Sequence, residues 1–313
     1  MTRKEWAKTI TAAGAMLLCW GTAPVAINFL NNTFSLVFQA FTRYALSMVL
    51  LWIYQKMLLC REDWEDLWHL VPRHLPWIVL AGFLTFVFQL FFTATYFYLA
   101  PGFANLLYQN QVVFSLFMGM LFFSEERAVL KNRFFYLGLG AVVTGVILVI
   151  RSRFGGISGS LDPRVFFPLG AGLAWSFVGV TVKKRLSPVF PNGFSTSLVF
   201  TVVTFFMFIA LLIEPGPMIH GTPAGSRWVI LLGTGFAGVG VGHTLFYYVV
   251  PRLGVSLTGG LQLMVPFIAG ITSFLVLGET VKPLQVGGGI LLLGGCALLL
   301  RTKGKATKEQ TPL

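Results

Sequence analysis

Ten apolar runs, each long enough to cross a hydrocarbon core of about 30 Å, constrain this chain more than any other feature. Hydrophobic residues make up 56% of its 313 residues and charged residues only 11%, whereas soluble domains average about 25% charged residues. The sequence therefore predicts an all-α integral membrane protein with ten transmembrane helices. The runs fall near residues 10–30, 34–55, 76–99, 102–123, 134–150, 165–182, 194–213, 228–250, 254–277 and 283–300.

The second half of the chain repeats features of the first. Residues 93–127 and 243–280 each hold an aromatic triplet followed by a proline, and then an apolar run that carries Gln109 or Gln262 and stops at an acidic end. Such a duplication in an apolar chain is typical of transporters built from two structural repeats. We expect a first five-helix repeat at 1–150, a linker at 151–164, a second five-helix repeat at 165–300 and a basic cytoplasmic tail at 301–313.

The positions of lysine and arginine predict the orientation. With the N-terminus inside, 17 of these residues fall in inner segments and 5 in outer segments, and Arg43 alone lies within a span. Because cytoplasmic loops carry the excess of positive charge, we expect both termini in the cytoplasm and a multi-pass protein of the cell inner (plasma) membrane. Five helices per repeat then make the second repeat inverted relative to the first. The net charge of +12 lies in loops and termini rather than on a helix face, and so gives no indication of nucleic-acid binding.

Two further patterns predict local structure. Residues 56–75 combine Trp64 and Trp68 with four acidic side chains, and should form an amphipathic segment at the membrane interface. Glycines also recur seven residues apart in the fifth and tenth runs, a spacing that favours close helix packing within the chain. These glycines are Gly138 and Gly145 in the fifth run and Gly288 and Gly295 in the tenth.

Residues spread over the chain resemble those of one known family. They are Trp20 and Gly21 followed by small residues in the first run, the mid-span Arg43, the Leu-Gly-Glu that ends at Glu279, and the glycine-rich fifth and tenth runs. In helix number, repeat length and motif order, the chain resembles the EamA family of the drug/metabolite transporter superfamily.

The chain departs from this pattern in its first repeat, which has Val112 and Val113 where the second repeat has Pro266. Transfer of a role between the two repeats is therefore weakest around the fourth helix. The resemblance implies an inner-membrane carrier for small metabolites, commonly an exporter of amino acids or related compounds, that works by alternating access.

Arg43 is the strongest candidate for substrate binding. A charged side chain inside the hydrocarbon costs about 2.5–3.5 kcal/mol, and Arg43 lies too deep in its span to reach water easily. Gln39 lies one turn before it on the same helix face. Arg43 could supply a fixed cation for a substrate carboxylate or other anion, or it could be a packing residue whose donors bond to backbone carbonyls.

His243 is the only histidine inside a predicted span. Tyr247 follows it at i+4 and shares its helix face. An imidazole can take up or release a proton near neutral pH, which would suit proton coupling. The alternative is a neutral histidine that serves packing and makes a hydrogen bond.

Polar and aromatic side chains recur on the faces of other spans. Gln89, Thr93 and Tyr96 share one face of the third span, and Gln109 and Gln262 occupy matching positions in the fourth and ninth. They could line a substrate path, or they could join helices by hydrogen bonds worth roughly 0.6–2 kcal/mol each.

Trp20 and Trp175 occupy matching positions in the first and sixth spans. Each lies a little inside its helix, where an indole could stack on a substrate or close a gate. Anchoring at the membrane interface is the alternative for both residues.

Other function classes lack support in the sequence. It contains no cluster of His, Cys and acidic residues, no paired carboxylates within the spans and no GxxxxGK[ST] phosphate-binding motif. The three cysteines have no paired spacing that would indicate a disulfide or a metal site. We therefore predict that the chain is not an enzyme and uses no cofactor or metal.

The sequence favours a secondary transporter that exports small metabolites, such as amino acids or carboxylates, across the inner membrane by alternating access. A multidrug or cation efflux carrier is the first alternative, although no carboxylate lies mid-span to bind a cation. A membrane-embedded receptor or enzyme is the second. The expected partners are an anionic or zwitterionic small molecule, the lipid bilayer and a coupled proton, in a monomer or a homodimer.

Overall fold

The computed structural model describes residues 3–59, 61–154, 162–253 and 261–309. Within these residues the backbone is helical apart from turns, loops and one isolated antiparallel bridge between Phe34 and Ile219. Seven of the described helical segments are long and apolar enough to cross a membrane, and two shorter apolar helices follow towards the C-terminus. The prediction of an all-helical membrane protein is confirmed.

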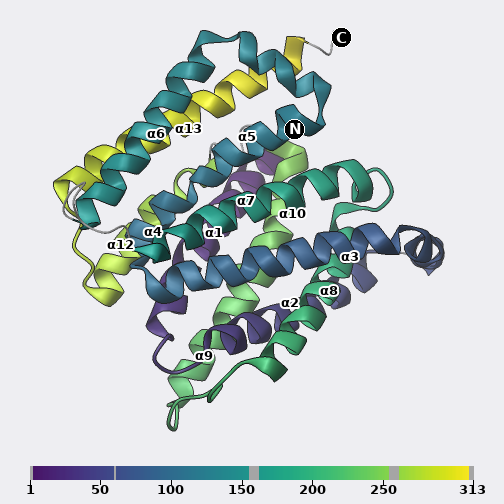
Figure 1. Ribbon diagram of the computed structural model, residues 1–313. Helices are drawn as coiled ribbons and strands as arrows, with labels where there is room; N and C mark the ends of the chain where they lie inside the picture. Colours follow the sequence, from purple (N-terminus) through teal and green to yellow (C-terminus); the bar gives the residue numbers. More distant parts are fainter. Residues whose placement is uncertain (1–2, 60, 155–161, 254–260, 310–313) are drawn as a thin grey trace.

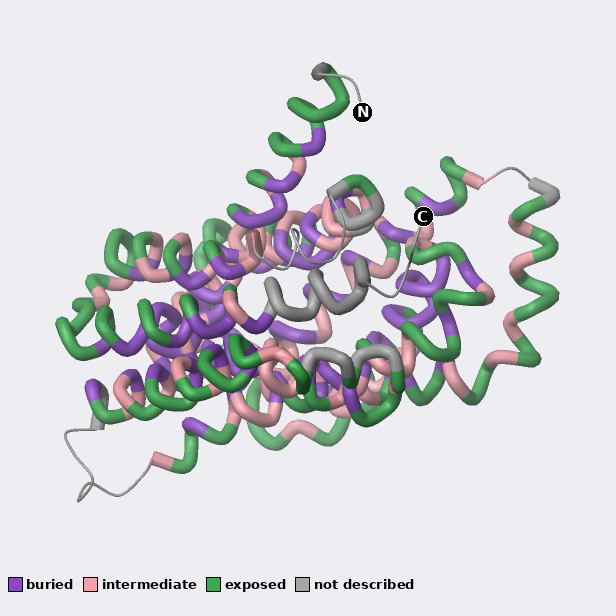
Figure 2. The backbone as a smooth tube through the Cα atoms, turned by 90° about the horizontal axis from the view of Figure 1, so that it is seen from above, coloured by how far each residue is buried: buried purple, intermediate pink, exposed green. Residues whose placement is uncertain are grey.

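The first repeat places helices at all five expected spans. Its third helix, α3, also includes most of the segment 56–75 that was expected at the interface, and contains Pro72 and Pro76. The first turns of α3 bend away from the rest of the helix, and appear end-on at the right of Figure 1 and side-on at the right of Figure 2. The elements are α1 (Arg3–Phe29), α2 (Leu36–Leu58), α3 (Arg61–Tyr98), α4 (Pro101–Tyr108), α5 (Asn110–Phe122), the 3₁₀-helix η1 (Ser124–Lys131) and α6 (Arg133–Phe154).

The second repeat contains two π-helical segments that no sequence pattern predicted. Residues 155–161 of the expected linker, and residues 254–260 at the start of the ninth expected span, lie outside the described residues. The elements are the 3₁₀-helix η2 (Pro163–Val165), α7 (Phe166–Thr181), the π-helix η3 (Val182–Leu186), α8 (Asn192–Ile213), α9 (Gly225–Thr234), the π-helix η4 (Gly235–Val241), α10 (Gly242–Leu253), α12 (Val265–Leu277) and α13 (Pro283–Glu309).

The two repeats pack against each other in matched pairs of helices (Figure 1). The second spans of the repeats, α2 and α8, pair with each other, as do the fifth spans, α6 and α13. The first span of each repeat packs on the fourth of the other, as α1 on α12 and α7 on α5. The third span of each packs on the second of the other, as α3 on α8 and η4 on α2. Exchanging the repeats maps each contact onto its partner, as expected for inverted repeats related by a pseudo-twofold axis.

Glycines bring the backbones of α6 and α13 together. A Cβ atom built on Gly145 would lie 2.5 Å from the backbone nitrogen of Leu292 and 2.7 Å from the carbonyl oxygen of Gly288. A Cβ on Gly295 would lie 2.6 Å from the carbonyl oxygen of Gly138. The prediction of close helix packing by these glycines within the chain is confirmed.

Burial follows the orientation of each helix towards the bundle. Buried residues lie on the helix faces turned to the centre, and exposed residues lie on the outer faces (Figure 2). Large apolar side chains are common on the outside, among them Leu212, Ile213 and Leu275. An outer surface of this kind is suited to lipid contact.

We call the side of the bundle on which α1 begins and α13 ends the near side, and the opposite side the far side.

Candidate functional site

Arg43 lies in the middle of α2 with only 2% of its surface exposed. Its Nη2 donates a hydrogen bond of 3.0 Å to the hydroxyl oxygen of Thr93 on α3. Its Nε has no hydrogen-bond partner, and no carboxylate of a described residue lies within ion-pair distance of its guanidinium group. The cation is therefore neither exposed to water nor neutralised by the described part of the chain, an arrangement that is costly in hydrocarbon.

Gln39 lies one helical turn before Arg43 and is fully buried. Its Nε2 donates to the carbonyl oxygen of Phe34 at 3.3 Å, whereas its Oε1 has no partner. Residues four apart on a helix share a face. One face of α2 thus presents an unsatisfied donor and an unsatisfied acceptor in neighbouring turns.

Thr93 connects Arg43 to a hydrogen-bonded series between α2 and α3. Its hydroxyl oxygen accepts from Arg43 Nη2 and also from Gln89 Nε2, at 2.9 Å. The Oε1 of Gln89 in turn accepts from the hydroxyl of Tyr44 at 3.2 Å. Both lone pairs of the Thr93 hydroxyl oxygen therefore accept a hydrogen bond. The orientation of the Arg43 guanidinium group is fixed by Thr93, whose own position is fixed by the hydrogen bond from Gln89.

The π-helix η4 covers the Arg43 backbone from the second repeat. The hydroxyl oxygen of Ser47, one turn after Arg43, lies 2.9 Å from the carbonyl oxygen of Gly235. A Cβ on Gly235 would lie 3.1 Å from the Cα of Arg43, so a larger residue would push η4 away from α2. Single π-helical turns are rare and often occur at functional sites.

His243 follows η4 and lies between aromatic rings. Its ring centroid is 5.5 Å from that of Trp20 and 5.3 Å from that of Phe200, in edge-on arrangements. Its Nδ1 is 2.8 Å from the carbonyl oxygen of Val239. Since a carbonyl can only accept, Nδ1 is assigned the proton and Nε2 remains an acceptor. The side chain of Tyr247, predicted to share this face, lies outside the described residues.

Trp20 joins α1 to η4. Its indole nitrogen donates to the carbonyl oxygen of Gly238 at 3.1 Å, and a Cβ on Gly242 would lie 2.5 Å from the same nitrogen. Trp20 is therefore in close contact with a glycine-rich segment of the other repeat, beside His243.

Ring contacts connect the other predicted aromatic residues. The ring centroids of Tyr44 and Phe200 lie 4.8 Å apart. Because Phe200 also contacts His243, these rings link the hydrogen-bonded series around Arg43 to His243. The ring centroid of Trp175 on α7 lies 4.9 Å from that of Phe88 on α3. Tyr96 is buried and contacts Phe92 at 4.8 Å, and Phe88 and Phe92 themselves lie 5.4 Å apart. Trp175 and Tyr96 are thus parts of one aromatic series along α3.

Gln109 and Gln262 stand apart from these contacts. Gln109 is buried at the junction that divides the fourth span into α4 and α5, and its carbonyl oxygen lies 3.8 Å from the sulfur of Cys296. Gln262 is half-buried before α12, and its side chain has no hydrogen bond to a described residue. The convergence of Arg43, Gln109, His243 and Gln262 on one cavity stays a prediction.

On the far side, carboxylates of the second repeat cap helices of the first. Gly278 ends α12 in the left-handed conformation, with φ of 67°, and turns the chain towards α4. Glu279 then accepts from the backbone N–H groups of Gly102 and Phe103, at 2.9 and 3.2 Å. Glu214 likewise accepts from the hydroxyl of Ser35 at 2.6 Å and from the N–H of Val37 at the start of α2.

These contacts use the unpaired N–H groups and the positive dipole at helix N-termini. They hold the first and second repeats together at the far ends of their spans.

A family model described as the EamA-like transporter family matches residues 7–151 and again residues 163–301. The chain belongs to this family. It carries two EamA domains, and the resemblance noted in the sequence is confirmed. Membership of a transporter family also confirms that this EamA protein is a multi-pass membrane transporter and not an enzyme.

Curated relatives of this EamA protein include an uncharacterized transporter from Haemophilus influenzae. It is 26% identical over 249 residues, which cover 74% of this chain and 78% of the relative. Two proteins named probable amino-acid metabolite efflux pump, from Salmonella typhimurium and Escherichia coli, are each 25% identical over 70% of this chain and 75% of theirs.

A solved crystal structure also resembles this EamA protein in fold. It superposes with a TM-score of 0.60 and 14% sequence identity, over 97% of this chain and 99% of the other. At that identity the likeness concerns the arrangement of helices alone.

Proposed function

We propose that this EamA protein exports small metabolites with a carboxylate group, amino acids above all, across the inner membrane by alternating access. The observation that carries the proposal is the buried guanidinium group of Arg43, whose Nε lacks a partner and which has no carboxylate among the described residues. A substrate carboxylate would neutralise this cation and accept from its free N–H. The hydrogen bond to Thr93 holds the guanidinium group ready for such an anion.

Gln39 extends the proposal from carboxylates to zwitterions. Its unpartnered Oε1 is an acceptor one turn away from Arg43, and the α-ammonium group of an amino acid is a donor next to a carboxylate. An amino acid would therefore satisfy both groups at once. The names of the relatives from Salmonella typhimurium and Escherichia coli, probable amino-acid metabolite efflux pump, support this substrate class.

The near side is assigned to the cytoplasm, because it carries the excess of lysine and arginine. Proton coupling is proposed for His243. The aromatic contacts through Phe200 and Tyr44 connect this histidine to the helix that bears Arg43. A change of charge on the imidazole would then act on the packing of α2, α8 and η4. Trp20, Trp175, Tyr96, Gln109 and Gln262 are proposed as further residues of the substrate path.

The test is transport in proteoliposomes with a panel of amino acids, carboxylates and the amines that lack the carboxylate. One hydrogen bond to a charged group contributes about 1.5–3 kcal/mol, so Arg43→Gln should lower amino-acid exchange at least about tenfold. Exchange of the matching amine should change little. Arg164→Gln, at an exposed arginine paired with Asp162, is the control and should behave as wild type. Amino-acid exchange by Arg43→Gln at the wild-type rate would contradict the proposal.

A further inference from the structure

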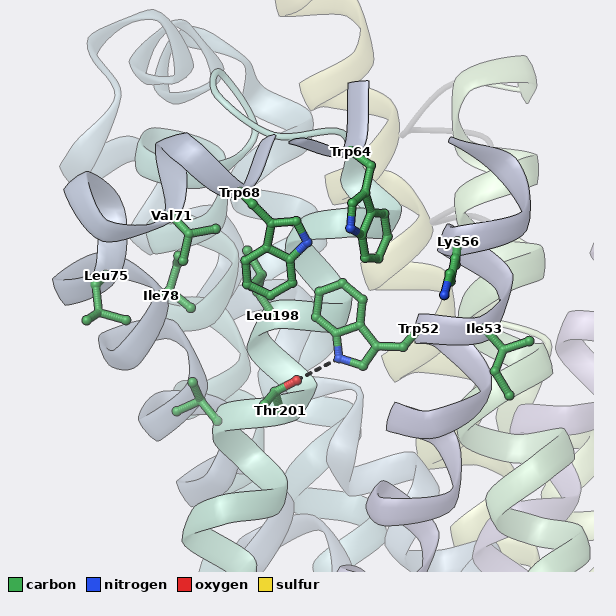
Figure 3. Close-up of a pocket in the computed structure, with 11 residues that line it drawn as sticks. Trp52, Ile53, Lys56, Trp64, Trp68, Val71, Leu75, Ile78, Leu198 and Thr201 are labelled. Carbon is green, nitrogen blue, oxygen red and sulfur yellow. Dashed lines mark hydrogen bonds between the residues drawn. The ribbon is translucent and has the colours of Figure 1, made fainter. Parts of the chain in front are cut away.

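A groove at the near end of the bundle lies apart from the polar residues around Arg43. It opens between the last turns of α2, the first half of α3 and the first half of α8, and has a volume of about 520 Å³. Figure 3 shows three indoles at its mouth, from Trp52, Trp64 and Trp68, with Lys56 beside them on α2. The rest of the lining is aliphatic apart from Thr201.

The groove is closed towards the interior of the protein. Ile78 and Leu198 form its floor and belong to the buried cluster that also contains Tyr44 and Phe200. Ile53, by contrast, is 53% exposed on the outer face of α2. The groove therefore opens to the surrounding bilayer, and its occupant arrives from there rather than from the transport path.

The indoles form a rigid wall. Trp52 donates from its ring nitrogen to the hydroxyl oxygen of Thr201 at 2.9 Å. The ring of Trp68 is stacked on that of Trp52, with centroids 5.5 Å apart and 19° between the planes. Phe194 contacts all three indoles edge-on, at 5.5 to 5.9 Å. The bend in the first turns of α3 brings Trp64 and Trp68 against α2 and α8 in this way.

Three donors at the mouth have no acceptor among the residues that the structure describes. The ring nitrogens of Trp64 and Trp68 are turned towards each other in Figure 3, and neither donates to a residue that the structure describes. The ammonium group of Lys56 likewise has no partner in the described part of the chain. Two indole N–H groups and one cation around an aliphatic groove fit a ligand that has anionic oxygens at one end and a hydrocarbon chain at the other.

We propose that this groove binds a phospholipid from the near leaflet. The phosphate lies at the mouth, where it accepts from Trp64 and Trp68 and neutralises Lys56, and an acyl chain lies along the aliphatic lining. Indole and lysine side chains are suited to this depth, because both place an apolar body in the hydrocarbon and a polar end at the headgroups. The bound lipid joins α2, α3 and α8, and so stabilises the packing around Phe200.

The test uses the full-length protein in detergent and measures lipid binding by native mass spectrometry. Dioleoylphosphatidylglycerol is compared with dioleoylglycerol, which has the same chains and no phosphate. The phospholipid should bind at least about tenfold more tightly, as expected from the loss of one charged hydrogen-bonding group. Lys56→Gln and Trp68→Phe should each lower phospholipid affinity by about three- to tenfold, and should leave binding of dioleoylglycerol unchanged.

Trp6→Phe and Lys8→Gln, on α1 and outside the groove lining, are matched controls and should bind as wild type. Trp68→Phe keeps the stacked ring and Lys56 is exposed, so both variants should remain folded and monodisperse. Equal affinity for the two lipids, or wild-type affinity in both groove variants, would overturn the proposal. So would the absence of a tightly bound phospholipid on the wild-type protein.

Discussion

Replacing Gly145 by alanine should separate α6 from α13, whereas the same change at Gly140 should not. The new methyl group would lie 2.5 Å from the backbone nitrogen of Leu292 and 2.7 Å from the carbonyl oxygen of Gly288. Backbone atoms cannot rotate away, so the helices must move apart by about 1 Å to reach ordinary carbon contacts of about 3.5 Å. Gly140, on the same helix, has no atom within 4 Å of its added Cβ.

The magnitude combines two opposing effects. Overpacking a close contact costs about 1–3 kcal/mol, and a gap of up to about 1 Å loses a quarter to a half of the neighbouring dispersion energy. Alanine in place of glycine returns up to about 1 kcal/mol through helix propensity. Gly145→Ala should therefore destabilise the protein by about 1–2 kcal/mol, while Gly140→Ala should be neutral or stabilising.

Thermal unfolding of both variants in the same detergent, followed by tryptophan fluorescence or by the loss of the monodisperse peak, measures the difference. Because the entropy of unfolding is about 2.1 cal/mol/K per residue, a loss of about 1–2 kcal/mol corresponds to a fall of about 1.5–3 °C in the unfolding midpoint of a chain of this length. If the two variants unfold within a degree of each other, the glycine contact between α6 and α13 does not limit stability, and the reasoning from close backbone approach is wrong.

Thr93→Val should weaken substrate binding about tenfold, because it removes the acceptor that holds Arg43, whereas Thr93→Ser should restore it; equal binding by both variants in a substrate-stabilisation assay would count against this role. Glu279→Gln should speed hydrogen exchange of the first amides of α4, because it removes the charge and one acceptor at that helix N-terminus; unchanged exchange would mean that the cap is dispensable. His243→Gln should abolish accumulation driven by a pH gradient and leave counterflow exchange measurable, since only the former needs net proton movement; a variant that still accumulates substrate like wild type would make His243 a packing residue.

Hydropathy was sufficient to predict most of the fold. Every apolar run that was expected to span the membrane contains a described helix, because a backbone in hydrocarbon must satisfy its hydrogen bonds within a helix. The spacing of the glycines in the fifth and tenth runs also predicted close helix packing within the chain, although the pairing of α6 with α13 is seen only in the structure. These features depend on local sequence and on the thickness of the bilayer.

Features that depend on distant contacts could not be predicted. The π-helix η4 differs from an α-helix by a one-residue change of hydrogen bonding, and its carbonyls bond to Ser47 and Trp20. Both partners lie about 190–220 residues earlier in the chain, and no pattern within residues 235–241 identifies them. The glycines of residues 235–241 were the only unusual feature of this segment in the sequence.

Part of the candidate site could be predicted, because it depends on local sequence. The depth of Arg43 in its span indicated a costly charge, and the helical period placed Gln39, Gln89 and Thr93 on particular faces. Which atoms would remain without a partner depends on side-chain positions contributed by α3. The far-side caps by Glu279 and Glu214 were missed because their partners lie in the other repeat, and the sequence showed Glu279 only as the end of an apolar run.

The position of η4 over Arg43 has a consequence for the biogenesis of the protein. Gly235 is made 188 residues after Ser47, a delay of about 10–40 s at ordinary rates of synthesis. During that time the first repeat is in the membrane without the segment that covers the arginine. Thr93 is made only 50 residues after Arg43, and so the first repeat brings its own hydrogen-bond partner for the charge. A nascent chain cut short after α6 therefore still contains a hydrogen-bond partner for the Arg43 guanidinium group, whereas one that ends before Thr93 lacks it.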